Sequence, residues 1–336
     1  PPPPPLTVAG VSPADGSSGT PGTGAVQVGF SAPLATGSPM PTVSPAVPGS
    51  WQTIGPSTVA FIPTAPWVPD TTVTVTVPGG SAGVTAADGA VLAKTVTDHF
   101  RVQAGSEMRL QELLAQLGYL PLTWKPNRGP LAPTDAGAQG LAAFSPPAGT
   151  FAWRHTGWPT SLTSIWNGGQ PNSITKGAVM AFEADHGLTI DGIAGKGVWT
   201  ALLKAVAAGQ GNTGGYSYAI GSKTRPESLT IWHDGAQVFH HRANTGITAA
   251  PTANGTFPVY ERLRRQVMKG TNPDGTHYAD PVQYVAYFNG GDAVHYIGRA
   301  DYGSPASLGC IELPLAAAAQ AWPNLTIGTL VTVTGP

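Results

Sequence analysis

This sequence of 336 residues has a single cysteine, Cys310. It also has few charged residues and lacks a long apolar run. With a single cysteine, no disulfide can form within the chain. Charged residues make up 10% of the sequence, against roughly 25% in an ordinary soluble domain, and the formal net charge is −1. This balance gives no electrostatic reason to expect nucleic acid as a partner. Since no apolar stretch approaches the roughly 18 residues of a membrane helix, we expect no membrane span in this chain.

Glycine and proline are abundant, with 44 and 34 residues, and hydrophobic residues make up 41% of the chain. This composition supplies enough apolar material for hydrophobic cores that are interrupted by frequent turns. The length predicts two or three domains. Because the chain opens on five prolines, which favour an extended polyproline conformation, we interpret residues 1–5 as a proline-rich tail that acts as a spacer.

Residues 6–103 contain short β-prone runs separated by turn residues. The clearest of these runs are 25–30, 58–62 and 71–77. Strands at this spacing without a helical period predict a β-sandwich. The segment resembles bacterial immunoglobulin-like modules, in its SPADG opening at 12–16, its FSAP step at 30–33 and its HFRV close at 99–102. Such modules are more often spacers than binding domains.

Residues 104–208 predict three helices. The first has leucines at 110, 113, 114 and 117, the second covers 175–186, and the third repeats the apolar spacing from Trp199 to Val206. The order of the motifs GAVMAF at 177–182 and DGIAG at 191–195 resembles the small three-helix peptidoglycan-binding domain. We expect a flexible glycine-rich linker at 209–215.

An insertion of about 121–169 interrupts the peptidoglycan-binding pattern. It carries four tryptophans, Trp124, Trp153, Trp158 and Trp166. Two interpretations stay open for these side chains. They could stack on sugars, or they could pack the insertion onto its own domain, which is the more frequent outcome for aromatic residues.

Residues 216–336 return to β character, with one helix expected at 315–321. The expected strands are 229–232, 237–239, 255–260, 282–288 and 330–334. Together, these segments predict a multidomain, mostly β protein. It would consist of an immunoglobulin-like β-sandwich at 6–103, a three-helix domain with an insertion at 104–208, and a mostly β domain at 216–336.

The candidate chemistry centres on Cys310, in the segment SLGCIELP at 307–314. Gly309 permits a tight turn, at which backbone N–H groups can face a developing oxyanion. A nucleophilic thiol also needs a base, and His295 ends an expected strand upstream in the chain. From spacing alone, two interpretations are open: a catalytic pair, or a buried structural cysteine with an unrelated histidine.

The third segment resembles the L,D-transpeptidase catalytic domain over roughly its whole length. The matching features are NTG at 244–246, PT at 251–252, NGTF at 254–257, Met268, Tyr278, the VH pair at 294–295, and Ser307-x-Gly309-Cys310-Ile311. The order of histidine, Ser-x-Gly-Cys and a hydrophobic residue is the specific part of this resemblance. The preceding domain that resembles a wall-binding module supports it.

The resemblance implies a role for each matched residue. Cys310 would be the nucleophile and His295 the general base, whose imidazole the backbone carbonyl of Tyr296 would hold. Residues at the cysteine turn would position the substrate and form an oxyanion hole: Ser307, Leu308 and Gly309. The stretch 268–278 would lie in a flap over the site, with Met268 and Tyr278 as candidate substrate-binding residues.

Two residues depart from the family pattern. Many members carry histidine where this chain has Leu308, and arginine or asparagine where it has Glu312. We include Glu312 among the substrate-binding candidates. Because a carboxylate there would repel the carboxylates of the substrate unless it is paired or faces away, substrate preference is the property that these departures affect.

Basic residues gather between Arg262 and Lys269, in the stretch that the resemblance assigns partly to the flap. A solvated flap is the default interpretation of this cluster, and attraction of anionic wall peptides is the alternative. We expect no metal and no cofactor. His240 and His241 are neighbours on an expected strand and point to opposite faces, so they cannot jointly bind one metal in regular geometry.

The resemblance implies a peptidoglycan L,D-transpeptidase that forms 3→3 cross-links through a Cys310 acyl-enzyme after D-Ala leaves the donor tetrapeptide stem. Its partners would be stem peptides, as donor and acceptor, and glycan strands bound by the peptidoglycan-binding domain. The expected location is extracytoplasmic, in the cell wall or secreted, with the signal segment absent from this chain. The alternatives are an L,D-carboxypeptidase, which hydrolyses the same acyl-enzyme, and a non-catalytic wall-binding spacer protein.

Overall fold

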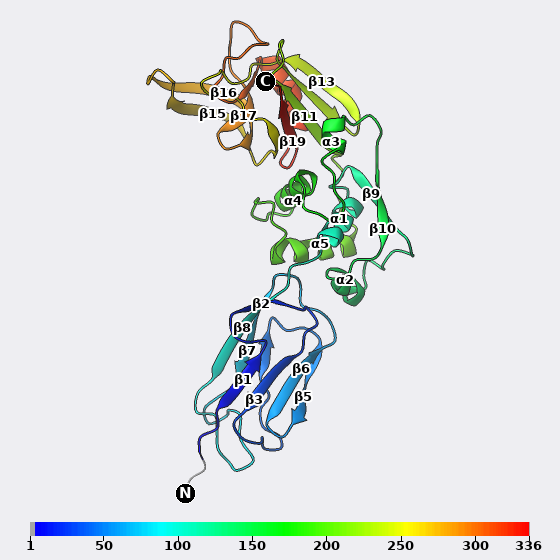
Figure 1. The fold of residues 1–336 in the computed structure, drawn as a ribbon, viewed down its shortest axis with the longest axis vertical. Helices are drawn as coiled ribbons and strands as arrows, with labels where there is room; N and C mark the ends of the chain where they lie inside the picture. Colours follow the sequence, from blue (N-terminus) through cyan, green and yellow to red (C-terminus); the bar gives the residue numbers. More distant parts are fainter. Residues whose placement is uncertain (1–3, 336) are drawn as a thin grey trace. The chain divides into compact units, whose positions relative to one another are not determined.

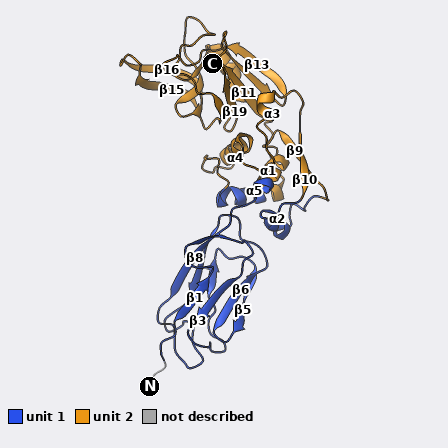
Figure 2. Ribbon diagram, in the orientation of Figure 1, with its two compact units in different colours: residues 1–109, 130–147, 195–203 blue, residues 110–129, 148–194, 204–336 orange. Residues whose placement is uncertain are grey.

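The structure, a computed structural model, describes residues 4–335, so three of the five prolines of the expected tail lie outside the described residues. The chain forms two compact units, coloured separately in Figure 2. One unit comprises Pro1–Arg109, Pro130–Pro147 and Gly195–Leu203, and the other Leu110–Gly129, Ala148–Ala194 and Lys204–Pro336. The segment 104–208 therefore contributes to both units. The division of the chain into three domains stays a prediction.

The first unit contains a β-sandwich of two four-stranded sheets (Figure 1). One sheet has the order β1-β3-β6-β5, with bounds Val8–Ser12, Val26–Phe30, Thr58–Pro63 and Gly49–Gly55. The other has the order β2-β8-β7-β4, with bounds Ser17–Thr20, Val96–Val102, Thr72–Val77 and Thr42–Ser44. Valines at alternate positions of β7 are buried, as expected for a strand with one face toward the core.

Trp67 lies at the centre of the sandwich core, with 1% of its surface exposed. Its ring centroid is 5.9 Å from that of Phe61 and 5.8 Å from that of Phe100. The indole Nε1 donates a hydrogen bond to the carbonyl oxygen of Pro45 at 2.9 Å. The polar edge of the ring is thus satisfied inside an apolar core.

The helices of the chain are short. Their bounds are α1 Glu107–Gln116, α2 Ala136–Ala142, α3 Thr160–Thr163, α4 Ser173–Asp185, α5 Lys196–Ala208, α6 Leu315–Ala321 and the 3₁₀ helix η1 Trp322–Asn324. Helix α4 begins after Asn172, whose side chain accepts a hydrogen bond from the Thr175 N–H at 3.0 Å. It ends before Gly187, which has a φ of +65°. These are the capping residues that a helix of this length needs.

The insertion forms a two-stranded hairpin of β9, Leu122–Pro126, and β10, Gly149–Trp153. Trp124 pairs across the hairpin with Phe151, at 4.7 Å between ring centroids, and Phe151 meets Trp166 edge-on at 5.0 Å. Trp158 is buried and meets Tyr216 edge-on at 5.8 Å. These contacts are of the kind expected if the insertion packs on its own surroundings.

The C-terminal part contains two sheets with α6 (Figure 1). The five-stranded sheet has the order β13-β12-β11-β19-β14, with bounds Ala236–Arg242, Ser228–His233, Ser217–Ser222, Leu330–Thr334 and Gly255–Pro258. The four-stranded sheet has the order β15-β16-β17-β18, with bounds Glu261–Thr271, His277–Asn289, Asp292–Tyr296 and Ile311–Leu313. A core of buried hydrophobic residues joins both sheets and α6. The mostly β fold class is confirmed.

Two features differ from the sequence expectation. The basic stretch from Arg262 is part of the long strand β15, which pairs with β16 over its full length. The stretch 209–215 is held in place, because the backbone N–H of Asn212 donates to the Leu117 carbonyl at 2.7 Å and its side chain donates to the Gly118 carbonyl at 3.2 Å.

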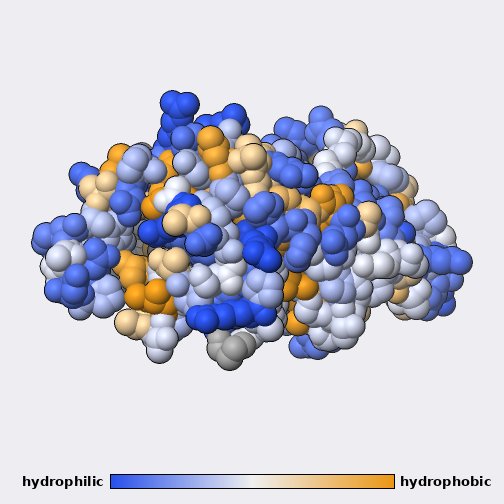
Figure 3. All heavy atoms as spheres, turned by 90° about the horizontal axis from the view of Figure 1, so that it is seen from above, coloured by the Kyte–Doolittle hydropathy of each residue, from blue (hydrophilic) through white to orange (hydrophobic). Residues whose placement is uncertain are grey.

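Hydrophobic residues on the face that Figure 3 shows lie in small groups between hydrophilic ones. Within residues 4–335, no helix has the length and apolar character required to cross a membrane.

Candidate active site

A pocket of about 970 Å³ opens beside the four-stranded sheet. Seven residues singled out from the sequence line it: Met268, Tyr278, His295, Ser307, Leu308, Cys310 and Glu312. The other two, Tyr296 and Gly309, are chain neighbours of lining residues. Strand β17 carries His295 and runs parallel to β18, which begins directly after Cys310. The register places His295 opposite Glu312 and thereby brings the distant histidine and cysteine segments to one wall.

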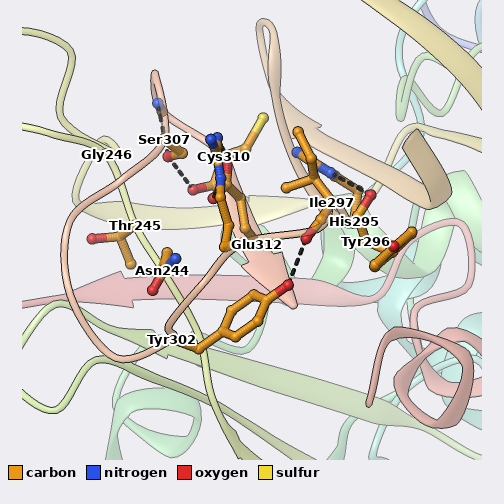
Figure 4. A network of polar contacts seen from close by, with 12 residues as sticks. Asn244, Thr245, Gly246, His295, Tyr296, Ile297, Tyr302, Ser307, Cys310 and Glu312 are labelled. Carbon is orange, nitrogen blue, oxygen red and sulfur yellow. Dashed lines mark hydrogen bonds and ion pairs between the residues drawn. The ribbon is translucent and has the colours of Figure 1, made fainter. Parts of the chain in front are cut away.

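The turn that presents Cys310 is fixed by Ser307. The Ser307 hydroxyl donates to the carbonyl of Cys310 at 2.6 Å and accepts from the N–H of Gly309 at 3.2 Å (Figure 4). Gly309 has a φ of +121°, and a Cβ there would lie 2.2 Å from Oδ1 of Asp292. Only glycine fits this position without a shift of its neighbours. Because the Gly309 N–H is already directed at Ser307, this donor would have to change partner before it could serve an oxyanion.

Cys310 is half-buried, and its side chain packs against a small cluster that includes Val282 and Ala293. Burial raises the pKa of the thiol to about 12, a hydrogen bond from the Ala293 N–H acts in the opposite direction, and the carboxylates of Asp292 and Glu312 raise it further. At neutral pH the thiol is therefore protonated. Sulfur chemistry at this site requires a base to take the proton.

His295 is 2% exposed. Its Nδ1 lies 3.1 Å from the carbonyl oxygen of Tyr296, and this contact assigns the proton to Nδ1 and leaves Nε2 as the basic nitrogen (Figure 4). Burial lowers the pKa of the imidazole, partly offset by the Tyr296 carbonyl and by Glu312. His295 is therefore neutral, and able to accept a proton, at neutral pH.

Within the described part of the chain, the only hydrogen bond of the Cys310 Sγ to a carbonyl oxygen is to Gly291, at 3.8 Å. No hydrogen bond joins the thiol to the His295 ring among these residues. The structure thus brings both residues to one pocket without a hydrogen bond between them. Catalytic contacts often tighten only when substrate binds, so their pairing stays a prediction.

Glu312 forms a bidentate ion pair with Arg299, which sequence reasoning did not single out. The guanidinium donates from Nε at 2.8 Å and from Nη2 at 2.6 Å. The carboxylate side chain is 3% exposed and that of the arginine 34%. The charge that would repel an anionic substrate is therefore neutralised. A buried carboxylate such as that of Glu312 requires a cationic partner. Nothing in the sequence indicated that Arg299 is this partner.

The NTG motif anchors the segment between His295 and Ser307. The Asn244 side chain donates to the Asp301 carbonyl at 3.0 Å and accepts from the Gly303 N–H at 2.9 Å. The next residue, Thr245, donates its backbone N–H to the buried Glu227 carboxylate at 2.7 Å and accepts from the Ser307 N–H at 3.0 Å. These contacts hold the loop that precedes the cysteine turn.

Strands β15 and β16 form the long hairpin that carries Met268 and Tyr278. In the register of this hairpin, Tyr278 lies opposite Gly270, and a Cβ at Gly270 would lie 2.4 Å from the tyrosine hydroxyl. Met268 packs against the same buried residues as Cys310, among them Val282 and Ala293. Burial raises the pKa of Tyr278, and the Cys310 thiolate that forms at high pH raises it further. The structure thus shows that the expected flap is the β15–β16 hairpin. Contact of Met268 and Tyr278 with substrate stays a prediction.

Among residues 4–335, no group of three or more His, Cys, Asp or Glu side chains is arranged to hold a metal ion. The pocket contains four carboxylates, Asp274, Asp280, Asp292 and Glu312, but they do not form such a group.

Three family models match the chain in sequence order. They are the bacterial Ig-like domain over residues 3–102, the putative peptidoglycan binding domain over 167–202, and the L,D-transpeptidase catalytic domain over 217–333. The last match contains the whole pocket and the Asn244 anchor. No curated protein matches the chain in sequence.

Several solved structures are similar to the chain. L,D-transpeptidase 3 from Mycobacterium tuberculosis is 15% identical, with 98% of this chain and 99% of that chain covered and a TM-score of 0.33. An L,D-transpeptidase from Mycobacterium smegmatis is 14% identical, with 99% and 100% covered and a TM-score of 0.33. The catalytic domain of the Enterococcus faecium L,D-transpeptidase is 26% identical, with 35% of this chain and 96% of that chain covered and a TM-score of 0.33. Another structure shows that domain acylated by ertapenem.

Proposed function

We propose that this chain, whose residues 217–333 match the L,D-transpeptidase catalytic domain, is a peptidoglycan L,D-transpeptidase with Cys310 as its nucleophile. One observation carries the proposal. A single thiol on a glycine turn and a buried neutral histidine line the same pocket, although 15 positions separate them in the chain. The match to a peptidoglycan binding domain over 167–202 supports the substrate class.

The acylation step starts from the neutral thiol. His295 Nε2 takes the proton of Cys310 while the sulfur attacks the carbonyl carbon between the third residue of a donor stem and its terminal D-Ala. The tetrahedral oxyanion is stabilised by backbone N–H groups of the cysteine turn. The carbon–nitrogen bond then breaks, the histidine proton passes to the departing amine, and free D-Ala leaves a thioester on the enzyme.

The second step transfers the acyl group. An amine of an acceptor stem attacks the thioester carbon, His295 accepts the proton from that amine, and the sulfur leaves as the thiol after it recovers the proton. The product is a 3→3 cross-link. Because the Glu312 charge is balanced by Arg299, the buried carboxylate beside His295 does not oppose an anionic donor.

We propose that this activity takes place outside the cytoplasm, in the cell wall or as a secreted protein, because its substrates would be peptidoglycan stems. Stem peptides serve as donor and acceptor, and we propose that the segment at 167–202 binds glycan strands, in accordance with the family that it matches.

The proposal is tested by product analysis with a purified donor tetrapeptide stem, with and without an acceptor stem that carries a free amine. We expect D-Ala release in both reactions and a 3→3 dimer only with acceptor. Release of D-Ala with tripeptide as the sole product would indicate an L,D-carboxypeptidase. If the folded protein releases no D-Ala, the result would indicate the non-catalytic, wall-binding spacer role. The Cys310→Ala variant is the negative control.

His295 is tested against a matched residue. His295→Ala should abolish D-Ala release, whereas His240→Ala, which alters an exposed histidine on β13, should leave it unchanged. Both variants should give the far-UV circular dichroism of the wild type. Full turnover by folded His295→Ala would remove the general base from the mechanism.

A further inference from the structure

The pocket at Cys310 offers few positive charges to an anionic substrate. Of the described residues that line it, only Lys269 and Arg299 carry a cationic side chain, because the pKa of the buried His295 is lowered. Lys269 is exposed on the flap strand β15, whereas Arg299 belongs to the loop between β17 and the cysteine turn. A carboxylate that enters the pocket therefore has two candidate partners.

The guanidinium of Arg299 uses only one of the two edges that fit a carboxylate. Its Nε and Nη2 donate to the Glu312 carboxylate at 2.8 and 2.6 Å. Within the described part of the chain, Nη1 donates no hydrogen bond, so the edge formed by Nη1 and the second hydrogen of Nη2 stays free. The side chain of Arg299 is 34% exposed and that of Glu312 only 3%, so the accessible part of this pair belongs to the arginine.

The free edge of Arg299 is held in place and stays charged. Its loop is fixed by the Tyr302 hydroxyl, which donates to the Ile297 carbonyl at 2.5 Å (Figure 4). The hydrogen bond with Glu312 raises the pKa of Arg299, and Asp280 raises it further, but Asp280 forms no ion pair with it among residues 4–335. A guanidinium restrained in this way loses little conformational freedom when a second carboxylate binds.

Glu312 connects Arg299 to the reacting sulfur. Cys310 and Glu312 are two positions apart, and the chain from Ile311 onward is a strand. Side chains two positions apart in extended chain point to the same face. In agreement, both residues line the pocket, and the Glu312 carboxylate raises the pKa of the Cys310 thiol. Arg299 therefore lies on the same face of the pocket as the nucleophile.

We propose that the free edge of Arg299 binds the C-terminal carboxylate of the D-Ala residue that leaves the donor stem, so that Arg299 selects donors with a free carboxylate one residue beyond the scissile bond. This inference rests on the proposed function, which supplies that donor. The planar edge of a guanidinium matches both oxygens of a carboxylate, which the ammonium of a lysine does not. Because this carboxylate departs with D-Ala, the contact acts in acylation and not in the transfer step.

The test compares two donors with the full-length protein: a tetrapeptide stem that ends in D-Ala and the same stem that ends in D-alaninamide. We expect kcat/KM for release of the terminal residue to be at least tenfold higher for the free acid. In the double variant Arg299→Met with Glu312→Gln, which leaves no unpaired carboxylate, this ratio should fall below threefold. Lys269→Met removes the other cation of the pocket and is the matched control, with the ratio of the wild type.

Equal kcat/KM for the two donors in the wild type would overturn this inference and leave the proposed function intact, whereas release from neither donor would overturn both. An equal loss for both donors in the folded double variant, with the ratio retained, would show a purely structural role of Arg299. Loss of the ratio in Lys269→Met would assign the carboxylate to Lys269 instead.

Should the double variant fail to fold, Arg299→Lys keeps a positive charge beside Glu312 but lacks the planar second edge. The ratio should then fall at least threefold from its wild-type value. An unchanged ratio in Arg299→Lys would overturn the assignment.

Discussion

The Arg299–Glu312 pair offers a quantitative test of the electrostatics around His295. Replacing Arg299 by methionine leaves a carboxylate, 3% exposed, without its partner. Two unit charges 4 Å apart attract by about 4 kcal/mol at an effective dielectric constant of about 20, and removal of one partner of a buried pair costs about 3–5 kcal/mol. Because the arginine side chain is 34% exposed, we expect about 3 kcal/mol for Arg299→Met at pH 7.

The cost comes from the Glu312 carboxylate, which stays buried after its arginine partner is removed. The double variant Arg299→Met with Glu312→Gln removes the unpaired charge, and we expect it within about 1 kcal/mol of the wild type.

The assay is equilibrium urea unfolding of the full-length protein at pH 7, with a double-mutant cycle over the two residues. A surface pair provides the matched control. Arg101 lies 3.0 Å from Asp70 with 59% of its side chain exposed, so Arg101→Met should cost at most about 1 kcal/mol. If Arg299→Met costs no more than Arg101→Met, Glu312 is solvated, and the reasoning about its burial is refuted.

Three further predictions concern other groups. Gly309→Ala introduces a methyl group 2.2 Å from Asp292 Oδ1 at a φ of +121°. It should lower the free energy of unfolding by about 1–3 kcal/mol and slow acylation at least tenfold. The control Gly298→Ala should change neither the stability nor the acylation rate. Burial raises the pKa of Glu183 to about 7, so the wild type loses stability as the pH rises from about 4.5 to 7. In urea unfolding, Glu183→Gln should therefore be about 2 kcal/mol more stable than the wild type at pH 8 and equal to it at pH 4. The Cys310 thiol has a pKa of about 12, and the pKa of His295 is lowered. The acylation rate measured by stopped flow should therefore fall toward acid pH and stay level from pH 7 to 9. A tenfold rise per pH unit between pH 7 and 9 would show a free thiolate that acts without the histidine.

Elements with a strong local pattern could be predicted from the sequence. The helix expected at 315–321 is α6, with the same bounds, and the strand expected at 330–334 is β19. Helix α6 has a uniform run of small apolar residues and begins after Pro314. Strand β19 has alternating valine and threonine residues. Strand β15 was not among the expected strands, because its basic residues indicated only a solvated flap and its pairing with β16 depends on contacts that periodicity does not encode.

The site divides in the same way. The cysteine turn and His295 could be singled out because their residue types follow a specific motif, and the structure places them at one pocket. Arg299 could not, because its role depends on a side-chain contact across 13 positions and on the burial of its partner. The anchoring of Asn212 beside Leu117 was hidden for the same reason, since a glycine-rich sequence predicts flexibility unless tertiary hydrogen bonds restrain it.

The most direct test of the central claim is the intact mass of the protein after incubation with a carbapenem, followed by peptide mapping. We predict one covalent adduct, located on Cys310, which forms in the wild type, is much slower in His295→Ala and is absent from Cys310→Ala. An unmodified wild-type protein, or an adduct on any other residue, would contradict the assignment of Cys310 as the nucleophile.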